Sequence, residues 1–250
     1  MRVPEWKSVA AEVAPIVLSL TDRELAQGDS ANLDTNLIPH LATYQLNACL
    51  NASIEANAAF QPSVAICLLR QCVEALTMID VGFQDSSLRD PLFEEWRAGK
   101  TTTGALRKRL KEEVWSRYGA GLWDESWTEF FSNLAKAVHP YAHYSPELLG
   151  WQESIVAFDG ESRFLVATGP RGQDPVKASR VALLQSLVIW ALSRLLLANR
   201  SSPDIISLKP AVDRLASAIG SSKLLFKSRD WADELMPHVA FNPGKDWLDA

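Results

Sequence analysis

Residues 62–83 read PSVAICLLRQCVEALTMIDVGF and carry the clearest structural pattern in the chain. Apolar side chains recur there at alternating steps of four and three residues, which places them on one face of an α-helix. Pro62 suits the first turn, because the amide at that position has no intrahelical partner. The pattern therefore predicts a long helix with a packed apolar seam. The seam consists of Ala65, Leu69, Cys72, Leu76, Ile79 and Phe83.

Helical patterns also flank this stretch on both sides. Upstream, Asp34 can cap a long helix that runs towards Phe60. Downstream, residues 85–100 are predicted to form a short helix between turns. One side of the upstream helix carries Leu37, Leu41, Tyr44 and Ile54.

Two further helices are expected between residues 101 and 138. The first ends before Gly119 and Gly121, which supply the stop, and its stripe is formed by Leu106, Leu110 and Val114. Asp124 is expected to cap the second, because aspartate is favoured at the N-cap. Pro140 ends this pattern, since the residue before a proline avoids the α region. The inward face of the second helix is predicted to hold Trp127, Phe130 or Phe131, Leu134 and Val138.

The last hundred residues combine a β-prone stretch with more helix. Ser154–Phe158 and Arg163–Thr168 flank the turn sequence DGES, which predicts a hairpin. A long apolar helix follows from about Pro175 to Asn199. The C-terminal fifth is expected to break into short helical pieces, because it contains Pro203, Pro210, Pro237 and Pro243.

These elements predict a mainly α protein, a helical bundle of about six to eight helices with a single β-hairpin insertion. Residues 1–250 are read as one domain, with a C-terminal helical extension over residues 200–250. The chain is 47% hydrophobic and 22% charged, which is typical of a globular protein. Its net charge of −5 gives no global nucleic-acid signature, so any anion site must be a local patch.

The amino-acid sequence also indicates in which cellular compartment the protein is located. Three cysteines without a CxxC pair or zinc-ligand spacing are typical of reduced thiols and predict a cytoplasmic protein. Residues 181–198 approach the length of a membrane span, but they contain Gln185 and Arg194, and charge at mid-helix is costly in lipid. We expect a buried core helix and no membrane association. Pro15 interrupts the apolar residues near the N-terminus, so no signal peptide is predicted.

Arg70 and Glu74 lie one helical turn apart within the apolar stretch, and Thr77 continues their stripe. Charges on such a helix are expected to be partly buried and therefore to need partners. One interpretation is an intrahelical ion pair that fixes a helix contact. The other is that both side chains reach the histidine segment and help to form a polar site between helices.

The histidine segment is HPYAHYS, which contains His139, His143 and Tyr144. Histidines four residues apart share a face of a continuous helix, although Pro140 interrupts this one. No HExxH motif occurs and Glu147 is the only close carboxylate, so we predict neither a metal nor another cofactor. Because imidazole titrates near neutral pH, acid–base catalysis or phosphate contact is the functional interpretation. The structural interpretation is that the rings close a helix corner.

Basic residues outnumber acidic ones by seven to two between Arg97 and Arg117. Most such runs are solvated helix faces. The alternative is a phosphate-binding edge, whose affinity would depend strongly on salt. The candidate nucleic-acid contacts are Arg107, Lys108, Arg109 and Lys111.

The arginine–glutamate pair, followed about seventy residues later by a helix that ends in HPYAHYS, resembles HEPN-type helical domains. The similarity is greatest to bacterial members related to abortive-infection and toxin proteins. It covers Asp34–Trp151 and includes the later long helix, so the HEPN-like core spans residues 34–199. The resemblance implies an up-and-down helical bundle, a homodimer and metal-independent cleavage of RNA.

The family signature is an arginine followed, after four to six residues, by a histidine. No arginine in this chain has that spacing, and Lys136, six intervening residues before His143, is the nearest equivalent. By resemblance His143 would be the catalytic histidine, and Lys136 would keep the positive charge without the planar guanidinium. The candidate catalytic set is completed by His139, Arg70, Glu74 and Tyr144.

Two hypotheses from different classes follow. The first is an RNA-directed, HEPN-like effector of a bacterial defence or stress system, either a metal-independent ribonuclease or an RNA-binding module. The second is a non-catalytic helical interaction or scaffold protein with a protein partner, which the missing arginine favours. We also expect a homodimer, because aromatic residues are enriched in interface cores and four tryptophans lie beside turns. These are Trp96, Trp123, Trp231 and Trp247.

Overall fold

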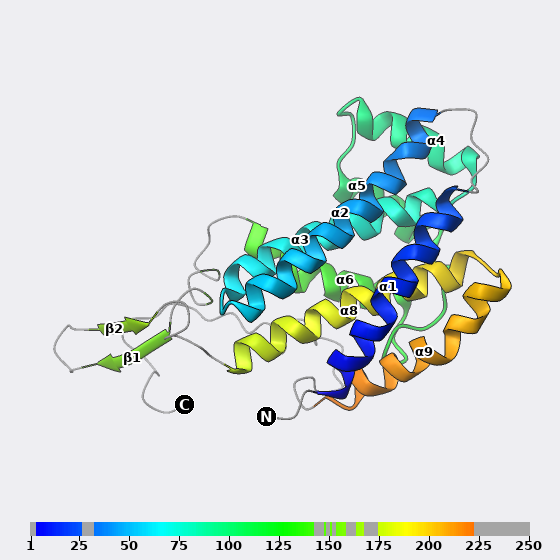
Figure 1. Ribbon diagram of the computed structural model, residues 1–250. Helices are drawn as coiled ribbons and strands as arrows, with labels where there is room; N and C mark the ends of the chain where they lie inside the picture. The colour runs from blue at the N-terminus through cyan, green and yellow to red at the C-terminus, as the bar shows by residue number, and fades with distance from the viewer. Residues whose placement is uncertain are drawn as a thin grey trace.

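The computed structural model describes residues 4–26, 33–142, 148, 151, 154–158, 164–167 and 175–222. These residues form a helical bundle, which confirms the mainly α fold class (Figure 1). The α-helices are α1 (Glu5–Ala26), α2 (Leu33–Ala58), α3 (Pro62–Gly82), α4 (Ser86–Arg97), α5 (Thr103–Glu113), α6 (Trp127–Val138), α8 (Pro175–Asn199) and α9 (Pro203–Gly220). Two short 3₁₀ turns are η1 (Trp115–Arg117) and η2 (His139–Ala142).

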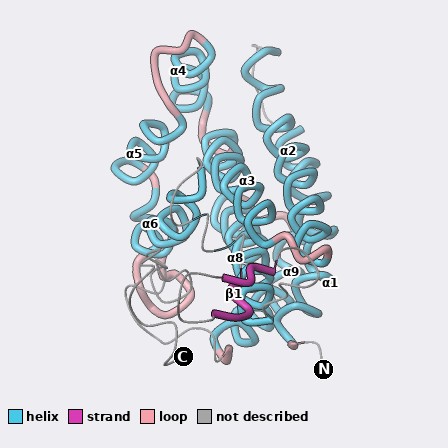
Figure 2. Tube along the Cα trace, turned by 90° about the vertical axis from the view of Figure 1, so that its left-hand side faces the viewer, coloured by secondary structure: helices cyan, strands magenta, loops and turns pink. Residues whose placement is uncertain are grey.

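Helix α3 lies in the middle of the bundle. Helix α2 runs along one side of it, and α4, α5 and α6 lie on the other (Figure 2). Helix α8 packs against α3 and also contacts α1 and α9. The six seam residues predicted for α3 are all buried, and Pro62 stands in the first turn, so both predictions for this helix are confirmed.

Helices α2 and α3 approach each other closely where Gly82 meets Pro39. A Cβ atom on Gly82 would lie 2.4 Å from the Cβ atom of Pro39, a distance that packed atoms do not reach. Glycine is therefore required for this contact. The contact brings the first half of α2 against the last turn of α3, so the two helices run antiparallel.

Helix α8 has the bounds that the sequence predicted. Within the described part of the chain, its residues 176–199 form the one helix that is long and apolar enough to cross a membrane. In the protein 83% of its most apolar window is buried. Its buried side chains pack against α1, α3 and α9.

The prediction that Asp34 caps α2 was wrong, because the helix already begins at Leu33. The buried side of α2 includes Leu46 and Leu50. The four apolar side chains noted on one side of this helix face solvent instead. Their exposed fractions are 52% for Leu37, 57% for Leu41, 73% for Tyr44 and 41% for Ile54. Periodicity alone did not show which side of α2 is buried, because apolar residues occur on both.

Two other predicted boundaries were also wrong. The N-cap of α6 is Ser126, which forms a capping box with Glu129, and not Asp124. The C-terminal region does not break at Pro210, since α9 continues through it as one helix. An internal proline costs about 3 kcal/mol of helix stability. Burial of the apolar side of α9 against α1 and α8 offsets that cost.

Between α6 and α8, two short strands pair antiparallel. They are β1 (Ser154–Phe158) and β2 (Phe164–Ala167), with Ser154 opposite Ala167. The hairpin as an insertion that packs on the helical body stays a prediction. Residues 223–250, which make up most of the predicted C-terminal extension, lie outside the described residues.

Candidate functional site

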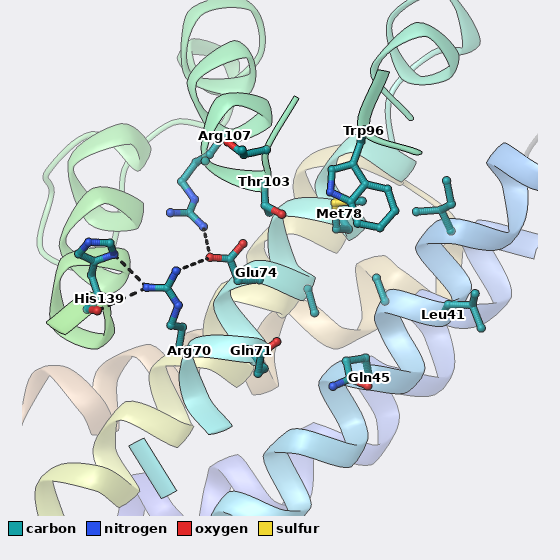
Figure 3. A pocket seen from close by; sticks show the side chains of 15 residues that line it. Leu41, Gln45, Arg70, Gln71, Glu74, Met78, Trp96, Thr103, Arg107 and His139 are labelled. Atoms are coloured by element: carbon teal, nitrogen blue, oxygen red, sulfur yellow. Dashed lines mark hydrogen bonds and ion pairs between the residues drawn. The ribbon is translucent and has the colours of Figure 1, made fainter. Parts of the chain in front are cut away.

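A groove of about 770 Å³ lies over α3, bounded by α2 on one side and by the end of α4 and the start of α5 on the other (Figure 3). Ligand sites in proteins have volumes of about 300–1,000 Å³. The two ends of the groove differ in chemistry. The charged end carries Arg70, Glu74, Arg107 and His139, and the apolar end carries Ile38, Leu41, Met78 and Trp96.

Arg70 is the centre of the charged end. Its Nη1 atom lies 2.9 Å from Nδ1 of His139 and 3.4 Å from the carbonyl oxygen of the same residue. Its Nη2 atom donates to Oε1 of Glu74 at 3.4 Å, and Nη2 of Arg107 approaches the same oxygen to 3.9 Å. Glu74 is therefore shared between two guanidinium groups (Figure 3).

The contact with Arg70 fixes the tautomer of His139. A guanidinium group only donates, so Nδ1 must accept, and the neutral ring then carries its proton on Nε2. A protonated ring would place two donors and two positive charges against each other. Because His139 is exposed, its Nε2–H group is available to a ligand in the groove.

Arg107 differs from the other basic residues of α5 because it points into the groove. Its Nε atom donates to Oγ1 of Thr77 at 3.2 Å, and its guanidinium carbon lies 5.7 Å from the ring centre of Phe131. Burial lowers the pKa of this guanidinium, Glu74 raises it, and Arg70 lowers it further. Arginine nevertheless stays charged in proteins. Nη2 has no hydrogen-bond partner among the described residues, so Glu74 satisfies Arg107 only in part.

The start of α5 opens on the same groove. Thr102 is the N-cap, and its Oγ1 atom accepts from the amide of Ala105 at 3.2 Å. Thr103 and Gly104 in the first turn line the groove. First-turn amides have no intrahelical acceptor, and the helix dipole places partial positive charge there. The helix start therefore adds to the positive potential of the groove.

The apolar end of the groove has a solvent-accessible aromatic side chain. Trp96, in the last turn of α4, is 37% exposed. Leu41 of α2 is also exposed, whereas Met78 of α3 is buried. The sequence singled out Trp96 only as a candidate interface residue, because the folding of α4 beside α2 was not predictable from its own pattern.

The structure brings together four of the predicted site residues, Arg70, Glu74, Arg107 and His139. Arg70 contacts the histidine segment at His139, whereas Glu74 contacts Arg70 and Arg107. Lys136 lies exposed on α6 and does not line the groove. His143 and Tyr144 lie outside the described residues. The remaining basic candidates, Lys108, Arg109 and Lys111, are exposed on α5 and do not line the groove either.

Ion pairs tie two of these basic residues to their own helix. Lys108 lies 3.9 Å from Glu112, and Arg109 lies 2.6 Å from Glu113. Each pair spans one turn of α5, which is typical of a solvated helix face. Of the four predicted nucleic-acid contacts, Arg107 is therefore the one that the fold places in the groove.

A second polar cluster, which we name the Asp80 cluster, lies further along α3 and was not predicted from the sequence. Asp80 is fully buried and accepts hydrogen bonds from the Tyr118 hydroxyl at 2.5 Å and from Nε1 of Trp115 at 2.7 Å. Burial raises the pKa of Asp80 to about 6, although these hydrogen bonds oppose the change. The sequence feature that could have indicated this cluster is an aspartate within the apolar stretch of residues 62–83. The cluster consists of Asp80, Gln84, Trp115, Tyr118 and Asn199.

No protein-family model, curated protein or solved structure matches this chain. The HEPN resemblance thus rests on the residues named in the sequence. Within the described residues, no group of three or more His, Cys, Asp or Glu side chains is placed to hold a metal ion. The groove remains the candidate site on its geometry alone.

Proposed function

We propose that this protein is an RNA-directed effector that holds an RNA phosphate at the charged end of the groove. The observation that carries the proposal is the convergence of Arg70, Arg107 and His139 from three different segments of the chain. Two guanidinium groups against one carboxylate leave excess positive charge in a chain whose net charge is −5. Contacts of this kind with phosphate supply most of the affinity of proteins for RNA.

The geometry supports RNA binding more directly than RNA cleavage. Cleavage without a metal needs a base to remove the proton of the 2′-hydroxyl, whose oxygen attacks phosphorus, and an acid to protonate the departing 5′-oxygen. With Nδ1 engaged by Arg70, the neutral ring of His139 presents Nε2–H and can donate a hydrogen bond to a phosphate oxygen. It becomes an acid only as the imidazolium, which requires a proton on Nδ1 and therefore displacement of Arg70. It becomes a base only after Arg70 has moved away. A second histidine, His143, would be needed for the other role.

For the location, biological role and oligomeric state of the protein, we keep the hypotheses drawn from the sequence. We propose that the effector works in the cytoplasm of a bacterium, in a defence or stress system, as a homodimer. We also propose that the paired strands β1 and β2 form a hairpin insertion that packs on the helical body.

RNA binding is tested by fluorescence anisotropy of a labelled single-stranded RNA at two salt concentrations. Arg107→Gln should weaken binding by about tenfold, because a charged hydrogen bond to phosphate is lost. Arg109→Gln is the matched control, since it makes the same change on the same helix at an exposed residue outside the groove. Equal affinity of the two variants, or no RNA binding by the wild type, would refute the proposal.

Cleavage is tested separately by incubating bulk RNA with the protein in EDTA. If cleavage occurs, His139→Ala and His143→Ala should each remove it. Binding without cleavage would assign the protein to the RNA-binding class of effector.

A second function, a non-catalytic interaction protein, is supported by the exposed side of α2. Leu37, Leu41 and Tyr44 follow the i, i+4, i+7 spacing of a helix face and are 52%, 57% and 73% exposed. Such a face suits a helical partner or a second copy of the chain. Light scattering tests this, since Leu37→Glu should lower the mass of any dimer, whereas a monomeric wild type would count against self-association.

A further inference from the structure

The groove is larger than a phosphate needs, and its two ends are close together. Glu74 and Met78 are four residues apart on α3, which separates the charged and apolar ends by about 6 Å along the helix. That separation is comparable with the one between a nucleobase and its own phosphate. The groove thus has the dimensions of a site for one nucleotide.

The charge of the groove favours a phosphomonoester over a phosphodiester. Arg70 and Arg107 against Glu74 give one net positive charge, and neutral His139 adds none. The start of α5 adds about half a charge. A phosphodiester within an RNA chain carries a single negative charge, whereas a phosphomonoester carries about −1.5 to −2 near pH 7. The monoester matches the local positive charge more closely.

The apolar end fits the base of the same nucleotide. Trp96 exposes part of its indole ring beside Ile38 and Met78, which together form a surface for a flat aromatic group. Nucleobases stack on such side chains without strong preference for sequence. Ile38 and Met78 contribute apolar surface only, and the amide side chains of Gln45 and Gln71 also line the groove.

We propose that the groove binds a phosphorylated terminal nucleotide, with its phosphomonoester at Arg70 and Arg107 and its base against Trp96. The assignment rests on the proposed RNA-directed function and narrows its ligand from RNA in general to a phosphorylated end. A free nucleoside monophosphate carries the same chemistry, so both sources of the group must be compared.

The site is tested by calorimetry with adenosine monophosphate, adenosine and ribose 5-phosphate on the full chain. Adenosine monophosphate should bind at least about tenfold more tightly than either of the other two, because only it occupies both ends. Trp96→Leu should lower its affinity about tenfold and leave that of ribose 5-phosphate unchanged. Equal binding of adenosine and adenosine monophosphate would overturn the proposal.

Matched variants separate the two ends of the groove. Tyr44→Leu is the control for Trp96→Leu, since it removes an exposed aromatic ring outside the groove. Arg107→Gln should weaken both phosphorylated ligands, and Arg109→Gln neither. Because Trp96 is exposed, its variant should melt within a few degrees of the wild type. Unchanged affinity in this folded variant would overturn the placement of the base.

The final comparison uses RNA decamers that end in a 5′-phosphate, a 3′-phosphate or hydroxyl groups only. One of the two phosphorylated decamers, the one whose end the groove accepts, should bind about tenfold more tightly than the decamer with hydroxyl ends. Equal binding of all three would overturn the terminal-nucleotide site and leave the RNA function intact. Binding of adenosine monophosphate without any RNA would support the site and refute the RNA function. If neither adenosine monophosphate nor RNA binds, both the nucleotide site and the RNA function are refuted.

Discussion

The two polar clusters on α3 use carboxylates in opposite ways. Glu74 lies in the groove with its side chain 29% exposed and faces two guanidinium groups at 3.4 and 3.9 Å. Asp80, six residues further on, is fully buried and is held at closer range by neutral donors from Trp115 and Tyr118. The carboxylate of the first cluster is partly open to solvent and faces charged groups. The carboxylate of the second is closed off from solvent and is bonded directly by neutral donors, while the nearby Arg117 guanidinium bonds Gln84 and also lowers the pKa of Asp80.

The difference shows how one helix can serve binding and stability at once. A buried carboxylate must have its hydrogen bonds satisfied, because an unmet group in the interior costs about 1–3 kcal/mol. The bonds of Asp80 therefore tie α3 firmly to η1 and, through Tyr118 and Asn199, to the end of α8. The charges in the groove are partly exposed, so they gain less from their pairing than fully buried charges do, and a ligand can replace their partners at lower cost.

The largest effect is expected from removal of the buried carboxylate. Asp80→Ala should lower the free energy of unfolding by about 3 kcal/mol or more, since two buried donors lose their acceptor. Glu74→Ala should lower it less, by about 1 kcal/mol, because Arg70 keeps its contact with His139 while the largely buried Arg107 loses its contact with Glu74. Urea unfolding monitored by circular dichroism measures both. Equal losses would remove the distinction between the clusters.

The pH dependence of the unfolding free energy should come from the buried carboxylate, Asp80. The pKa of Asp80 is raised from 3.8 to about 6, so its contribution to stability is present below pH 3.8 and is lost as the pH rises through 6. That difference in pKa corresponds to at most about 3 kcal/mol.

Asp80→Asn cannot ionise and should lack this dependence. The unfolding free energy of the wild type should therefore fall relative to that of the variant between about pH 4 and about pH 6, and the difference should level off above that. Parallel pH profiles for the two proteins would show that folding does not raise the pKa of Asp80.

A smaller effect is expected at the hydroxyl that links the buried cluster. Tyr118→Phe should lower the free energy of unfolding by about 1–2 kcal/mol, because the hydroxyl contacts Asp80 at 2.5 Å and Asn199 at 2.9 Å. It should also raise the pKa of Asp80 further, since that hydrogen bond favours the ionised form. Tyr44→Phe, at an exposed tyrosine, is the control and should change stability by less than about 0.5 kcal/mol.

The smallest change in stability is expected at the groove. His139→Ala should alter the melting temperature by no more than about 2 °C, because the ring is exposed and Arg70 keeps its ion pair with Glu74. RNA affinity should nevertheless fall in the same variant. A large loss of stability would mean that His139 closes a helix corner and is not a ligand group.

Particular residues show how far sequence reasoning reached. The seam of α3 and the bounds of α8 were predicted, since both rest on helical spacing. The sequence left two interpretations open for Arg70, and the structure shows both contacts, with Glu74 on the same helix and with His139. The capping of α6 by Ser126 and the continuity of α9 through Pro210 were not predicted. At the start of α6 and within α9 the sequence contains more than one residue that could mark a helix boundary, and packing determines which of them does.

The sequence by itself determined which segments are helical and which of them are apolar enough for the core, because that periodicity depends on residues three and four apart. Tertiary structure alone decided that Arg107 enters the groove while Arg109 faces solvent, and that Trp96 lies beside Met78. It also placed Trp115, 35 residues away in the chain, on Asp80. These contacts depend on how whole helices pack, and many distant side chains set that packing together, so no local pattern contains them.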